Sequence, residues 1–186
     1  MSNETLMMVA IVVVAVVVVV AAWIVLRRRK TAALRARFGP EYDHVLHSAR
    51  TPAEAERELL NRQSRVEKFA IRPLSPEDGD RLSTAWRNVQ AKFVDDPKNA
   101  AIEADRLITD VMRSRGYPVD DPNRVIDDLS VDHAHVINHY RAGREIVVPH
   151  EQGQASTEDL RQAMVHFRAL FDELVAGVRP NVRRAS

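Results

Sequence analysis

The chain contains no cysteine, and this absence excludes disulfide bonds, thiolate nucleophiles and zinc sites built from cysteine. Glycine is also scarce. The six glycines are dispersed, so they form no glycine-rich loop of the kind that cradles phosphate groups. No serine lies in a GxSxG motif, which marks the nucleophile of many hydrolases. The common motifs of nucleotide binding and of nucleophilic catalysis are therefore missing.

The chain also lacks a large net charge, because its basic and acidic residues nearly balance. The 186 residues include 27 Lys and Arg against 26 Asp and Glu. Residues 1–30 hold four basic residues and one acid, which leaves 23 basic and 25 acidic residues in the rest of the chain. A protein that binds nucleic acids without sequence preference needs a basic face. Because the chain after residue 30 has no excess of basic residues, we expect no nucleic-acid partner.

A long apolar run, by contrast, is present near the N-terminus. Residues 6–26 contain no charge, proline or glycine. As a helix, 21 residues are about 30 Å long, which matches the hydrocarbon core of a bilayer. The run therefore predicts one transmembrane helix, through which the chain contacts the lipid bilayer.

The charges that flank this run indicate its orientation. The tail at residues 1–5 carries one acid and no basic residue, whereas six basic residues follow the run: Arg27, Arg28, Arg29, Lys30, Arg35 and Arg37. Basic residues stay on the cytoplasmic side, so we expect a single-pass protein of the inner (cytoplasmic) membrane with its N-terminus outside. The alternative of a cleaved signal peptide needs basic residues before a shorter run. The six basic residues could also hold anionic lipid headgroups.

The rest of the chain shows repeated signals for helix starts. A capping residue precedes a proline four times, and a serine cap precedes a threonine once: Thr51-Pro52, Ser75-Pro76, Asp96-Pro97, Asp121-Pro122 and Ser156-Thr157. A cap side chain accepts a free backbone N–H, and proline at the first helical position loses no hydrogen bond. These signals predict about five helices between residues 51 and 177. Before them, residues 31–38 should continue the membrane helix, Gly39-Pro40 should end it, and residues 41–50 should form a short helix.

Apolar residues recur in these segments at the period of a helix. The clearest stripe is made by Leu160, Met164, Phe167, Phe171 and Leu174. Trp86 lies in the middle of another stripe, and we expect it in the core. Only residues 144–149 could form a strand, and they could equally finish a helix. The predicted fold is all-α, with one N-terminal transmembrane helix followed by a cytoplasmic bundle of about five to six helices.

This organisation gives five predicted parts along the chain. They are a short extracytoplasmic tail at 1–5, the transmembrane helix at 6–26, a basic juxtamembrane segment with a short helix at 27–50, the bundle at 51–177 and a flexible tail at 178–186.

One cluster of polar residues is a candidate metal site. Asp132, His135 and His139 lie close in sequence, and two histidines four residues apart share a face when both are on one helix. The glutamate of an HExxH motif is missing, and solvent-exposed histidines without metal are the preferred interpretation. His133 is expected to make a cap or core hydrogen bond.

Arg115-Gly116-Tyr117-Pro118 is the most distinctive short run. It could be a binding loop. The preferred interpretation is a helix stop, in which Gly116 takes a left-handed conformation and Tyr117 folds back on the last turn.

Several motifs together resemble a known family. They are WRNVQAKFVDDP at residues 86–97, ADRL at 104–107, RGYP at 115–118, Tyr140-Arg141, and TEDLR at 157–161 with His166-Phe167-Arg168. They are similar to a family of small bacterial proteins of unknown function, in which one N-terminal span precedes a cytoplasmic helical domain. The resemblance covers most of residues 35–176. It implies the same architecture and brings no catalytic residues.

The sequence favours a membrane-anchored interaction or scaffold module with an unidentified protein partner. We expect no cofactor and no catalytic residue, and a non-enzymatic role is preferred. One alternative is a metal-binding or enzymatic domain that uses the residue 132–139 cluster. A second is a ligand-binding sensor domain with a pocket in the bundle.

Overall fold

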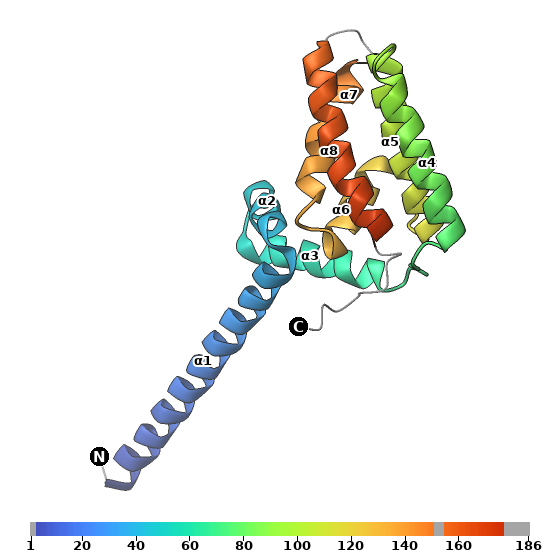
Figure 1. Cartoon of the computed structure of the whole chain (residues 1–186). Coiled ribbons are helices and arrows are strands. Elements are labelled where there is room, and N and C mark those ends of the chain that lie inside the picture. The colour runs from blue at the N-terminus through green and yellow to red at the C-terminus, as the bar shows by residue number, and fades with distance from the viewer. Residues whose placement is uncertain (1–2, 151–154, 177–186) are drawn as a thin grey trace, which may run out of the picture.

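The structure, a computed structural model, describes residues 3–150 and 155–176. All regular secondary structure in these ranges is helical, which confirms the predicted all-α class. The helices (Figure 1) are α1 (Asn3–Phe38), α2 (Pro40–Ser48), α3 (Pro52–Val66), α4 (Pro76–Lys92), α5 (Pro97–Arg115), α6 (Pro122–Asp132), α7 (Ile137–His150) and α8 (Thr157–Ala176). The predicted flexible tail at 178–186 lies outside the described residues.

The predicted helix starts are confirmed, and each has a side-chain cap. In α3, Thr51 Oγ1 accepts the backbone N–H of Glu54 at 3.2 Å. The proline that follows supplies a first residue whose missing N–H costs no hydrogen bond. The caps of the other predicted starts accept backbone N–H groups in the same way: Ser75, Asp96, Asp121 and Ser156.

Helix α1 is long and apolar enough to span a membrane between Ile11 and Phe38. It projects away from the other helices (Figure 1). Every side chain from residue 11 to residue 30 is exposed, the apolar ones included. A continuous exposed apolar surface of this kind is unfavourable in water, and only a bilayer or another apolar surface would cover it.

The last turns of α1 belong to a small core with α2 and α3. Leu34 and Phe38 of α1 are buried, and they pack with side chains of α2, α3 and α6: Tyr42, Val45, Ala55, Leu59, Val66 and Val131. Gly39, with φ +49°, lets α2 fold back sharply from α1, because few residues other than glycine adopt a positive φ. This core joins helices on both sides of residue 50, where the sequence analysis divides the juxtamembrane segment from the bundle.

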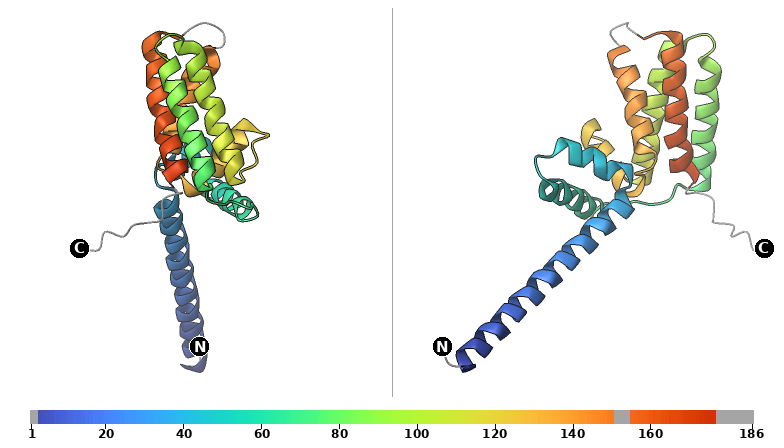
Figure 2. Two further views of the ribbon diagram at one scale, coloured as in Figure 1. Left: turned by 45° about the vertical axis from the view of Figure 1, so that its right-hand side comes forward. Right: turned by 90° about the vertical axis from the view of Figure 1, so that its left-hand side faces the viewer.

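Helices α4, α5, α7 and α8 form the main bundle (Figure 2). Its core continues from Leu82 in α4 to Leu174 in α8. α8 packs along α7 and α5, while α4 packs along α5. α7 and α8 approach closely at Gly143 in α7, where a Cβ atom would lie 2.6 Å from the ring of Phe167. Residues 144–149, for which a strand was an alternative, continue α7.

The turn after α5 fixes the segment between α3 and α4. Gly116 has φ +92°, and the backbone N–H of Tyr117 bonds to Met112 O at 3.0 Å, as expected of a helix stop. A Cβ atom at Gly116 would also lie 2.5 Å from Ala70 O, so this position has no room for another residue. Arg72 donates its N–H to Arg115 O beside this turn, which ties the α3–α4 segment to the bundle.

Candidate functional site

A groove between α4 and α8 is the most distinctive surface of the bundle. Both helices pack along α5, and they lie side by side on one face of the bundle (Figure 2). One hollow of about 570 Å³ opens between them near Trp86, and a second of about 290 Å³ opens near Phe93. Arg168 lines both hollows, so the two form one groove interrupted by its side chain.

The floor of this groove is apolar. Trp86 is 1% exposed, which confirms its predicted place in the core, and its ring stacks on Phe171 with centroids 4.6 Å apart. At the other end the floor is formed by Phe93 and Met164. Val165, beside them on α8, is 54% exposed.

Arginines form the rim of the groove. Arg168 lies over the ring of Trp86 at 5.7 Å and is held by Asp172 at 2.7 Å. Arg161 forms a bidentate pair with Glu158, whose hydrogen bonds to this guanidinium lower the pKa of Glu158 to about 2. Arg87 bonds only to a threonine hydroxyl and has no carboxylate partner among the described residues.

An apolar floor with a cationic rim suits the binding of an amphipathic segment. Ser83 and Asp172 both line the groove, and Asp172 pairs with Arg168. Amphipathic helices bind in grooves of this kind by placing apolar residues on the floor and polar residues at the edge.

The six basic residues predicted to lie at the membrane surface divide into two groups. Arg27, Arg28, Arg29 and Lys30 are exposed on α1 and form no salt bridge within the described chain. Arg35 lies over the ring of Tyr42 and is 3.9 Å from Asp43. Arg37 is 3.7 Å from Asp132. The first four are thus available to a ligand, whereas Arg35 and Arg37 already contact the protein.

The structure does not bring the candidate metal ligands together. Asp132 pairs with Arg37, at the end of α6. His135 lies in the turn between α6 and α7, so it does not share a helix face with His139. The Nδ1 atom of His139 instead lies 3.1 Å from Nδ1 of His166 on α8. In the described ranges, no three His, Asp or Glu side chains converge as a metal site.

His133 ends α6 and is buried. Its Nδ1 lies 3.2 Å from Glu173 Oε1, the kind of core hydrogen bond that the sequence analysis expects. Burial lowers the pKa of His133 below its ordinary 6.5, and the hydrogen bond to Glu173 opposes this shift only in part. Protonation would place an additional charge inside the protein, so His133 is neutral in the folded state at neutral pH.

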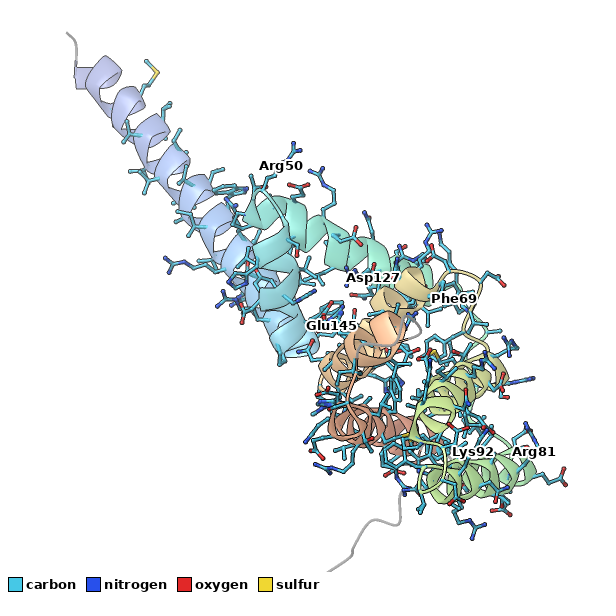
Figure 3. The ribbon with its side chains drawn as sticks, turned by 90° about the horizontal axis from the view of Figure 1, so that it is seen from above. Arg50, Phe69, Arg81, Lys92, Asp127 and Glu145 are labelled. Atoms are coloured by element: carbon cyan, nitrogen blue, oxygen red, sulfur yellow. The ribbon has the colours of Figure 1, made fainter. Side chains whose placement is uncertain are left out.

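A buried ionic network, which the sequence analysis missed, joins the small core to the bundle. Glu41 of α2 is fully buried, and it accepts hydrogen bonds from Arg62 of α3 and Arg141 of α7, each at 2.8 Å. Arg62 also contacts Asp127 of α6 at 2.8 Å and Glu58 at 3.1 Å. Figure 3 shows Asp127 near α3, where α6 meets it.

One signal for this network exists in the sequence. Arg62 lies in register with Ala55, Leu59 and Val66, which form the buried stripe of α3. A charge on an apolar stripe indicates a buried partner, because an unpaired buried charge is costly. The partner on α7 is 100 residues from Glu41, so the sequence spacing could not identify it.

Comparison with models of protein families, with curated proteins and with solved structures found no match for this chain. The family resemblance therefore stays a prediction.

Proposed function

We propose that this chain is a single-pass membrane protein whose helical domain holds a partner protein at the membrane surface. In this proposal α1 crosses the inner membrane of a bacterial cell, and residues 27–186 lie in the cytoplasm. The single observation that supports the docking role best is the α4–α8 groove, which combines an apolar floor with an arginine rim.

The proposed occupant is an amphipathic helix with acidic residues at the edges of its apolar face. Arg87 and Arg161 lie on opposite sides of the groove, on α4 and α8. A carboxylate of a bound helix would pair with Arg87, and a second would share Arg161 with Glu158, while apolar residues of the helix would cover Phe93 and Val165. The metal-binding alternative has less support, because Asp132 and His135 each contact a different partner.

Site-specific cross-linking in membranes tests the docking role. A photoreactive amino acid at Val165 should cross-link to one partner protein, and the attached peptide should be an acidic amphipathic helix. The same amino acid at Asp110, which is exposed on α5 outside the groove, should not give this product. Equal products from both positions would contradict the proposal.

A charge reversal supplies the matched control. The double variant Arg87→Glu with Arg161→Glu should remove the cross-link at Val165. The double variant Arg106→Glu with Arg113→Glu changes the same number of charges on the exposed face of α5 and should leave the cross-link unchanged. An unaffected product in the first variant would exclude an acidic partner.

The orientation needs a separate test. A reporter that is active only in the cytoplasm should be active when fused after Ser186, because the basic residues that follow the span favour the cytoplasmic side. Activity of a periplasmic reporter at that position would overturn the orientation and leave the groove as a docking site on the other side.

A further inference from the structure

A further hollow is formed where α3 lies against α1. A hollow of about 470 Å³ opens between the two helices where the apolar part of α1 ends. From α1 it is lined by Trp23, Leu26, Arg27 and Lys30, and from α3 by Ala53, Glu56, Arg57 and Leu60. We call this hollow the α1–α3 niche.

The niche combines two chemistries. Trp23, Leu26 and Leu60 form an apolar wall that continues into the exposed apolar surface of α1. Arg27 and Lys30 lie one and two turns beyond Trp23 on the same helix face, and the Arg27 guanidinium is 5.4 Å from the Trp23 ring. A tryptophan at this position is typical of a membrane–water interface.

The charge of the niche favours an anion. Arg27, Lys30 and Arg57 form no salt bridge with any described residue. The single carboxylate of the niche, Glu56, already accepts a hydrogen bond from Thr31 Oγ1 at 2.5 Å. Three cations against one occupied carboxylate leave a net charge of about +2 facing the cavity.

The same Glu56 fixes the shape of the niche. Its Oε1 atom receives the Thr31 hydroxyl from α1 and lies 3.4 Å from the Tyr42 hydroxyl of α2. Leu59, one turn further along α3, is buried in the small core with Phe38. The first turns of α3 are therefore held against α1, and Arg57 is carried to the level at which the apolar run ends.

We propose that the α1–α3 niche binds one anionic phospholipid of the adjoining leaflet. The lipid phosphate accepts hydrogen bonds from Arg27, Lys30 and Arg57, and an acyl chain lies along Leu26 and Leu60. A zwitterionic lipid binds less well, because its ammonium group faces the same three cations. The inference rests on the proposed crossing of the membrane by α1.

Quenching of Trp23 by brominated lipids tests this site in the full-length chain. The protein is placed in phosphatidylcholine vesicles that contain 10 mol% of either brominated phosphatidylglycerol or brominated phosphatidylcholine. Trp86 is buried in the bundle and contributes the same background to both samples. We expect the anionic quencher to be several-fold more effective, and equal quenching by the two lipids would overturn the proposal.

Two variants distinguish lipid binding in the niche from general electrostatic attraction between the protein surface and anionic lipids. Arg57→Gln should reduce the preference for phosphatidylglycerol about fivefold, the factor expected for one basic side chain at a membrane surface. Arg50→Gln is the control, since Arg50 is exposed in the turn before α3 (Figure 3) but does not line the niche. An equal loss in both variants would show surface charge alone and would contradict the niche.

Failure of the membrane proposal is distinguishable from failure of the niche. Vesicle flotation reports insertion of α1 whatever the lipid charge. A protein that floats with pure phosphatidylcholine vesicles and shows no preference for the anionic quencher would retain the membrane anchor and overturn the lipid site. A protein that floats with no vesicle would overturn both.

Discussion

Replacing Glu41 by leucine should destabilise the folded protein strongly, because Glu41 is the central anion of the buried network. Its fully buried carboxylate binds Arg62 of α3 and Arg141 of α7, each at 2.8 Å. Without it, Arg62 keeps Asp127 and Glu58 as partners. Arg141 keeps only the side-chain oxygen of Asn138 among the described residues. The variant therefore leaves one guanidinium, which is mostly buried, without a direct ion-pair partner.

The expected loss follows from the cost of an unpaired buried charge. Removing one partner of a buried ion pair typically costs about 3–5 kcal/mol. A domain of this size has a total stability of about 5–15 kcal/mol, so the loss is a large fraction of it. For a chain of about 150–250 residues, each 1 kcal/mol lowers Tm by about 2–4 °C, which predicts a decrease of roughly 6–20 °C.

Urea unfolding of residues 31–186 measures this loss with two signals. This fragment keeps Leu34 and Phe38 and contains Trp86 as its one tryptophan, so fluorescence follows the bundle while circular dichroism follows all helices. The two signals should coincide in the parent fragment. In Glu41→Leu the dichroism transition should begin at lower urea, because α2 and α3 lose their connection to the bundle through Arg141.

The matched control removes the unpaired charge as well. The double variant Glu41→Leu with Arg141→Met should recover at least half of the lost stability, since an apolar replacement of a buried pair is often nearly neutral. A loss of less than 1 kcal/mol in Glu41→Leu, or a double variant that is less stable than the single one, would refute the reasoning.

Three further variants address the two cores and the dependence on pH. Trp86→Ala should lower the free energy of unfolding in urea by about 3–5 kcal/mol, because a fully buried ring stacked on Phe171 is lost. Red-shifted emission of Trp86 in the native parent protein, together with an unchanged melt of the variant, would contradict its burial. Phe38→Ala should cost a similar amount in the full-length chain, and no change would mean that α1 is not part of the small core. Burial lowers the pKa of His133 in the folded state, so below pH 6.5 the unfolded chain binds a proton more tightly than the folded chain does. The contribution of neutral His133 to the free energy of unfolding should therefore be full above pH 6.5 and should be lost as the pH falls through the folded-state pKa. His133→Asn should therefore show a smaller loss of stability between pH 7.5 and 5.5 than the parent protein, and equal losses would contradict this assignment.

The helix boundaries could be predicted because they depend on neighbouring residues. Thr51 caps α3 through Glu54, three residues away, and Gly116 ends α5 through its own backbone conformation. These are local interactions, which sequence spacing reports directly. The stripe that contains Trp86 predicts burial for the same reason, since residues on one helix face share one environment.

The arrangement of the helices depends on contacts that sequence spacing does not report. The break between α6 and α7 falls at residues 133–136, which contain neither glycine nor proline, the usual signals of a helix end. This break separates His135 from His139, and it explains why the two histidines do not share a face. The niche beside Trp23 depends on α3 folding back along α1, which is stabilised by the long-range contact of Thr31 with Glu56.

The two proposed sites are connected through one continuously packed segment. Phe38 of α1 and Leu59 of α3 share the small core, so the helix proposed to cross the membrane ends inside the folded domain and not in a flexible linker. From that core, Glu41 contacts Arg141 on α7, and α7 packs along α8, one wall of the groove. A lipid in the α1–α3 niche would therefore act on a segment that is joined to the groove by buried contacts. In the proposed topology, these contacts would limit how far the groove can move relative to the membrane, which would help a docking module to position its partner.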